Sequence, residues 1–181
     1  MLCAAWVLVF PPVSARAQSS EPTEYQMKAA FLFNFAKFID WPPSSFATAE
    51  APFSICIFGS DPFGQAIDST LKGQSIRGRG VTVQRVHDAS QLRHCQMAFV
   101  ASSERHHLQD ILQAIRGASV LLVGESPGFA ADGGTIQFQM EDNRVRFSIN
   151  PDAAERAGLR ISSKLLSLAT IVRDSAGSGK G

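Results

Sequence analysis

Four short strand-like runs in the middle of the chain constrain the fold most, because each is separated from the next by a segment of helical pattern. The runs occupy residues 53–58, 81–86, 97–101 and 119–123. The helical segments between them are 61–71, 88–93 and 104–116. Repeated strand–helix units of this length are typical of an α/β fold with a mainly parallel, Rossmann-like sheet flanked by helices.

The segments on either side of this repeat have patterns of their own. Residues 24–40 form a dense apolar helix, which begins with a capping box of Thr23 and Gln26 and is expected to be buried. Residues 135–140 and 145–149 alternate apolar with polar side chains, which predicts an antiparallel C-terminal hairpin on the sheet.

Capping residues predict the remaining helix boundaries. Asp61 is expected as the N-cap of the second helix, with Pro62 as its first residue. Asn150 precedes a short helix that Gly158 ends, and Ser162 precedes a final apolar helix that extends to about residue 172.

The beginning of the chain resembles an export signal. An apolar stretch at residues 2–10 is far shorter than the roughly 20 residues that cross a bilayer, and Ala15-Arg16-Ala17 has the small-x-small pattern of a cleavage site. We therefore expect a signal peptide at 1–17, one domain at 18–174 and a flexible tail at 175–181.

Cys56 and Cys95 lie within apolar runs, so both thiols are expected near buried backbone. In an oxidising compartment they are a candidate disulfide, which we favour over two free buried thiols. Closing a loop of about 39 residues would stabilise the fold by roughly 4 kcal/mol in the loop-entropy model.

Composition and motifs argue against several classes of function. The 17 Lys and Arg residues nearly balance the 16 Asp and Glu residues, which argues against binding to nucleic acid. No spacing of cysteines suits zinc, and we expect no metal and no cofactor. Residues 124–128 match the G-x-S-x-G pattern of serine hydrolases, but Pro127 has no N–H to stabilise an oxyanion. We therefore expect a protein that is not an enzyme.

Several runs of the sequence resemble the YfiR-like family, in order, over residues 24–173. They are Lys28–Phe38 with Trp41-Pro42, Ile55–Gly59 with Asp61–Gly64, Gly128-Phe129 with Gly133-Gly134, Phe147–Asn150, and Leu159–Leu166. The resemblance implies an α/β fold, frequent homodimers, and a structural disulfide at Cys56 and Cys95. Some members carry a second cysteine pair, but Ala130 and Gln137 occupy that neighbourhood in this chain.

The resemblance also implies a function. Well-understood members are periplasmic repressors that bind the periplasmic sensor domain of an inner-membrane diguanylate cyclase, which lowers cyclic-di-GMP and biofilm formation. A peptidoglycan-binding outer-membrane lipoprotein can sequester the repressor. The aromatic end of the first helix and the basic loop at 77–80 are the candidate partner-binding segments. Their residues are Phe35, Phe38, Trp41, Arg77 and Arg79.

A periplasmic small-ligand-binding module that serves a transporter or a sensor kinase is the alternative function. Its cleft would lie beyond the carboxyl ends of the parallel strands. The candidate cleft residues are Gly59, Ser60, Asp61, Gly64 and Ser102.

Overall fold

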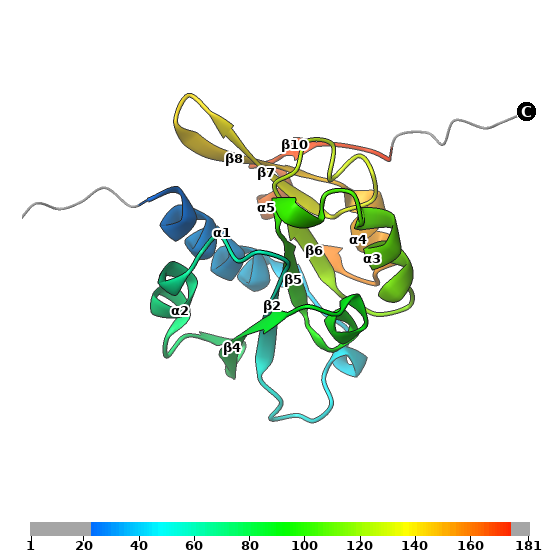
Figure 1. The fold of residues 1–181 in the computed structure, drawn as a ribbon. Helices are drawn as coiled ribbons and strands as arrows, with labels where there is room; N and C mark the ends of the chain where they lie inside the picture. Colours follow the sequence, from blue (N-terminus) through cyan, green and yellow to red (C-terminus); the bar gives the residue numbers. More distant parts are fainter. Residues whose placement is uncertain (1–22, 175–181) are drawn as a thin grey trace, which may run out of the picture.

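The computed structural model describes residues 23–174, and the predicted signal peptide and tail lie outside them (Figure 1). The helices are α1 (Glu24–Phe38), α2 (Gln65–Leu71), α3 (Leu108–Ala114), α4 (Pro151–Arg156) and α5 (Ser163–Leu166), with short 3₁₀ helices η1 (Pro43–Ser45), η2 (Ala89–His94) and η3 (Ser102–Glu104). The strands are β1 (Ile39–Asp40), β2 (Phe53–Phe58), β3 (Ser75–Ile76), β4 (Arg79–Val86), β5 (Met97–Val100), β6 (Leu121–Gly124), β7 (Ile136–Glu141), β8 (Arg144–Ile149), β9 (Arg160–Ile161) and β10 (Thr170–Ile171).

Within these residues one sheet of eight strands has the order β10-β8-β7-β6-β5-β2-β4-β3. The neighbours β4, β2, β5, β6 and β7 run parallel, and β8 returns antiparallel to β7 as the predicted hairpin. The expected fold class, a mainly parallel α/β sheet with a C-terminal hairpin, is confirmed. Strand β2 pairs with β4 on one side and with β5 on the other. The order of the strands across the sheet therefore reverses at β2, and the crevice at this point lies between β2 and β5.

Alternation along β2 divides the interior into two layers. Ile55 and Ile57 belong to the larger core, which α1 and α2 cover, whereas Cys56 and Phe58 belong to a smaller core beneath α3 and η2. Figure 1 shows α1 and α2 on the side of the sheet opposite α3. All six residues of β2 are buried, as expected for a central strand with both faces covered.

Helix α1 begins as predicted and ends two residues early. Thr23 and Gln26 form the capping box, with the Thr23 hydroxyl accepting from the backbone N–H of Gln26. Ile39 and Asp40 then become β1, which pairs antiparallel with β9. The helix is not buried all round, because Asn34 and Lys37 face solvent.

Two predicted helix starts are wrong. The carboxylate of Asp61 accepts from the backbone N–H groups of Phe63 and Gly64, which closes a turn ahead of the helix. Gly64, at φ 53°, is the N-cap of α2, so Asp61 and Pro62 stand outside the helix. The predicted helix at 104–116 is likewise shorter, because η3 and a turn replace its first part.

The predicted final helix also stops early, after one turn at Leu166. Thr170 and Ile171 instead pair in parallel with β8 as an edge strand, and Val172 donates a backbone hydrogen bond to Ile149. Pairing with β8 therefore overrides the local helical pattern of this segment.

Cys56 and Cys95 form the predicted disulfide, with their Cα atoms 6.0 Å apart. Both residues are buried in the smaller core. The bond joins the middle of β2 to the segment just before β5. It therefore links two adjacent strands at the place where the strand order reverses.

The ring of Phe129 fixes the long β6–β7 connection to the sheet. A Cβ atom at Gly124 would lie 2.6 Å from Cε2 of this ring, and one at Gly134 would lie 2.2 Å from Cε1. Only glycine leaves room for the ring at both positions. The connection is therefore packed closely against the end of β6.

Candidate functional site

Three of the predicted partner-binding residues gather at the edge of the sheet where the parallel strands begin. Trp41, Arg77 and Arg79 line one small cavity of about 50 Å³ together with Phe46, which the sequence did not single out. Phe53, the first residue of β2, forms the back of this cavity. We call the group Trp41, Phe46, Arg77 and Arg79 the Trp41 surface.

Trp41 is partly buried and is held at both ends of its side chain. Its ring packs edge-to-face on Phe53, with centroids 4.9 Å apart and an interplanar angle of 88°. Its indole N–H donates to the backbone oxygen of Gln96 over 2.9 Å. The ring is therefore a rigid aromatic group, the type of side chain that dominates protein interfaces.

The two arginines of the surface have different environments. The Arg79 guanidinium lies 3.9 Å from the centroid of Phe46 and donates to the carbonyls of Thr48 and Ala51 over 3.1 and 2.7 Å. Arg79 therefore holds the connection between β1 and β2 in place. Arg77 is exposed and pairs with Asp40.

The two predicted phenylalanines lie in different places. Phe35 is only 1% exposed and contacts Phe138 and Phe147, so it belongs to the core and its assignment to a partner contact is corrected. Phe38 is partly buried at the end of α1, and the Lys164 ammonium lies 5.4 Å from the centre of its ring.

The predicted ligand cleft, at the opposite edge of the sheet, is filled at its centre. A Cβ atom at Gly59 would lie 2.5 Å from Ser103 Oγ, and the backbone N–H of Ser60 donates to that oxygen over 3.0 Å. The β2–α2 connection thus packs against η3, which begins with the exposed Ser102. The crevice between β2 and β5, where α/β sheets often bind ligands, has no room at Gly59.

Charged side chains engage the remaining cleft residues. Arg85 binds Asp61 over 3.0 Å, Asp68 over 2.6 Å and the backbone oxygen of Gly64 over 3.0 Å. The hydrogen bond from Arg85 lowers the pKa of Asp68. Asp61 and Gly64 therefore belong to a turn that Arg85 fastens to α2.

A buried ion pair near the same edge was missed by sequence reasoning. Lys28 of α1 is 3% exposed and binds Glu125, at the end of β6, over 2.6 Å, as well as Glu24. Burial acts to lower the pKa of Lys28, but the hydrogen bonds with Glu125 and Glu24 outweigh it and the pKa is raised. The Tyr25 hydroxyl donates to Glu125, and burial together with the Glu125 charge raises the pKa of Tyr25.

Local signals for this pair are weak. Lys28 lies on the same helical face as Ala29 and Leu32, which marks it as a lysine among core positions. Nothing in the sequence indicates that Glu125, 97 positions away, is its partner.

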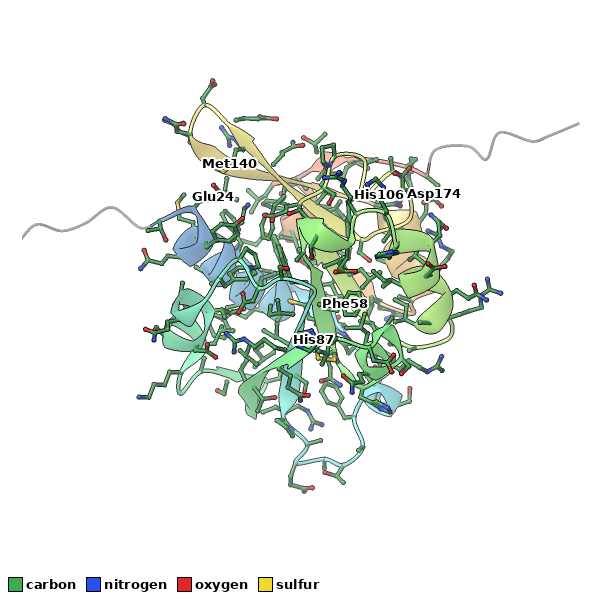
Figure 2. All side chains as sticks on the ribbon, viewed as in Figure 1. Glu24, Phe58, His87, His106, Met140 and Asp174 are labelled. Carbon is green, nitrogen blue, oxygen red and sulfur yellow. A yellow bond between two sulfur atoms is a disulfide. The ribbon has the colours of Figure 1, made fainter. Side chains whose placement is uncertain are left out.

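Large exposed apolar side chains lie elsewhere, on the C-terminal part of the sheet. They are Met140 near the tip of the β7–β8 hairpin, which Figure 2 labels, Ile171 in the edge strand β10, and Leu168 just before it. Leu168 is 69% exposed, the largest value of the three.

Two further searches covered residues 23–174. None of the helices there has both the length and the apolar character that a membrane span requires. In the same part of the chain, no three His, Cys, Asp or Glu side chains converge as a metal site would need. Gln137, in the neighbourhood of the second cysteine pair, accepts from the backbone N–H of Ala130 over 3.1 Å.

Comparisons with known proteins agree with this architecture. A family model described as YfiR/HmsC-like matches residues 25–170. The fold is similar to the crystal structure of a conserved domain protein from Vibrio cholerae O1 biovar El Tor, with a TM-score of 0.56, 9% identity and coverage of 82% of this chain. It is also similar to an ABC domain in complex with L-Trp from Streptococcus pneumonia, with a TM-score of 0.53, 9% identity and the same coverage. The chain spans 60% of the length of each of these two proteins.

Proposed function

The chain belongs to the YfiR/HmsC-like family, and from this premise we propose that it is a non-enzymatic periplasmic regulator of cyclic-di-GMP signalling. In this proposal it binds the periplasmic sensor domain of an inner-membrane diguanylate cyclase and holds the enzyme inactive. The observation that carries the proposal is the family match across residues 25–170, which spans nearly the whole described fold.

The Cys56–Cys95 disulfide supports a location outside the cytoplasm, because such bonds persist in oxidising compartments. The predicted signal peptide agrees with this location. Export would place the protein on the same side of the inner membrane as the sensor domain of the cyclase.

The Trp41 surface is our candidate contact for the cyclase. It combines a fixed indole ring with an exposed guanidinium, and tryptophan and arginine are enriched among the residues that dominate binding energy. Phe38, under Lys164, extends the apolar area at the end of α1.

Arg77 allows this contact to be tested without disturbing the fold, because its side chain is 58% exposed and its pair with Asp40 lies at the surface. In pull-downs with the purified cyclase sensor domain, we expect Arg77→Glu to weaken binding by about tenfold or more. Arg146→Glu, an equal charge change at an exposed position of β8, is the matched control.

In cells, deletion of the gene should raise cyclic-di-GMP and biofilm formation, and Arg77→Glu should fail to restore them. Unaltered cyclic-di-GMP in the deletion strain would reject regulation of a cyclase. Restoration by Arg77→Glu as effective as by wild type would reject the Trp41 surface and leave the regulatory role in place.

The homodimer and the lipoprotein are proposed as additional partners. Leu168 and Ile171, beside the open edge of β10, are our candidate homodimer contact, since exposed apolar edges favour association. Leu168→Lys should convert a dimer to a monomer in light-scattering measurements. A peptidoglycan-binding outer-membrane lipoprotein would compete with the cyclase for the regulator.

A further inference from the structure

A second hollow lies at the carboxyl ends of β5 and β6, beside the filled crevice. Its volume is about 220 Å³, and the connection from β5 to α3 and the connection from β6 to β7 form its walls. Arg105 and His106 come from the first connection, and Ser126, Phe129 and Asp132 come from the second. This is the edge at which parallel α/β sheets bind ligands.

Ser126 is the first observation that points to a ligand. The residue is 7% exposed and lines the hollow, and its hydroxyl, which is not among the fully buried unpaired atoms, makes no side-chain hydrogen bond within residues 23–174. A serine hydroxyl can both donate and accept a hydrogen bond, so this oxygen is available to a group that enters the hollow. A bound acceptor in the hollow would supply the missing partner.

Arg105 is the second observation. Its Nε donates to Nε2 of His106 over 2.9 Å, so that the two side chains lie against each other. Within residues 23–174 Arg105 makes no ion pair, whereas Arg85 and Arg156 each bind a carboxylate. The terminal nitrogens of Arg105 are therefore free to form the paired hydrogen bonds that suit a carboxylate or a phosphate.

We propose that this hollow binds a small, singly charged oxyanion, a carboxylate or a phosphate, between the Arg105 guanidinium and the Ser126 hydroxyl. The guanidinium supplies the charge and Ser126 donates one hydrogen bond. Asp132 on the rim repels a second negative charge and accepts from a hydroxyl of the ligand. Phe129 and Leu108 form an apolar wall of the hollow.

This site is independent of the proposed regulatory role, and it lies at the opposite edge of the sheet from the Trp41 surface. The site is nevertheless next in sequence to a residue that contacts α1. Glu125, which binds Lys28, immediately precedes Ser126 in the chain. A ligand that holds Ser126 in place also holds the residue that anchors the helix.

The test is an NMR titration of the purified, disulfide-bonded protein at constant ionic strength near pH 6, where inorganic phosphate carries mainly one charge. The probes are inorganic phosphate, acetate and, as an uncharged control, glycerol. We expect phosphate or acetate to cause saturable shifts of the Ser126 amide and the His106 ring, and glycerol to cause none. A response to only one of the two anions would tell phosphate from carboxylate ligands.

Three variants assign the shifts to the hollow. Arg105→Gln should raise the dissociation constant by about tenfold, the usual consequence of losing a charged hydrogen-bond pair. Ser126→Ala should raise it by a smaller factor. Arg146→Gln, which removes an exposed arginine elsewhere, should leave it unchanged.

Arg105 is exposed, so its replacement is not expected to unfold the protein, and thermal melting of each variant checks this. The proposal is overturned by the absence of saturable shifts up to about 50 mM anion, which is weaker than ordinary ligand binding. It is equally overturned if Arg105→Gln and Arg146→Gln bind alike, because the anion would then be responding to surface charge alone.

Discussion

The two edges of the parallel sheet are held in different ways. At the edge where the strands begin, an indole hydrogen bond and the Arg79 contacts with Phe46 and backbone carbonyls hold the β1–β2 connection, and the disulfide ties β2 to the segment before β5. At the edge where the strands end, ion pairs dominate, namely Lys28 with Glu125 and Arg85 with Asp61 and Asp68.

At the edge where the strands begin, the contacts that stabilise the fold are made by other residues than the exposed charge of Arg77. Arg77 pairs with Asp40 at the surface, so its charge can be changed with little expected effect on the packing of the Trp41 surface. At the second edge Lys28 and Arg85 are paired with carboxylates, whereas Arg105 makes no ion pair within residues 23–174. Four predictions test this comparison, and they run from the largest expected effect to the smallest.

Removing the disulfide should have the largest effect and should fall mainly on the edge where the strands begin. We expect Cys56→Ala/Cys95→Ala to lower the free energy of unfolding by roughly 4 kcal/mol, the loop-entropy value for this separation. Denaturant unfolding of wild type with and without reductant is the control. Equal stability of oxidised and reduced protein would show that the bond adds nothing.

Breaking the buried ion pair should have the next largest effect and should loosen the other edge. Lys28→Met leaves Glu125, which is 12% exposed, without its cation, and we expect a loss of about 3 kcal/mol. The double variant Lys28→Met/Glu125→Gln should regain much of this loss, because no buried charge is then unpaired. A double-mutant cycle measures the difference, and simple additivity would disprove the coupling.

Substitution of the two arginines of the Trp41 surface should lower the free energy of unfolding by clearly different amounts. Arg79→Ala removes two hydrogen bonds to carbonyls and a cation–aromatic contact, so we expect a loss of about 1–2 kcal/mol and faster amide exchange in residues 41–52. Arg77→Ala should cost about 0.5 kcal/mol or less. Similar losses for both variants would contradict the separate roles assigned to them.

The smallest expected effect is the dependence on pH of the stability that Asp68 contributes. The pKa of Asp68 is lowered in the folded protein by its hydrogen bond with Arg85, so the pair stabilises the fold above the ordinary carboxyl pKa of about 3.9. That contribution is lost as the pH falls through the lowered pKa. Asp68→Asn should therefore cost at most about 1 kcal/mol at pH 7, since Asp68 is half exposed, and a smaller amount near pH 2. Urea unfolding at both pH values measures this, and a pH-independent loss would contradict it.

Local patterns were sufficient to predict much of this fold. The alternation of strands and helices, the capping box of α1 and the β7–β8 hairpin each depend on residues that are close in sequence, so their signals are visible in the chain. The disulfide could be predicted because Cys56 and Cys95 are the two cysteines outside the predicted signal peptide.

The errors arose where distant segments decide the structure. Residues 167–172 have helical spacing, but the free edge of β8 pairs with Thr170 and Ile171. Phe35 is aromatic and lies among candidate contacts in sequence, yet the hairpin covers it. Lys28 and Glu125 meet only after α1 packs across the sheet, so no local pattern identifies the pair.

The ring of Phe129, held between the backbones of Gly124 and Gly134, also bounds the hollow that contains Ser126. The aromatic wall of this hollow is therefore already in place before a ligand binds. Little conformational entropy is lost when preorganised groups close on a ligand, so even a few polar contacts can yield measurable affinity.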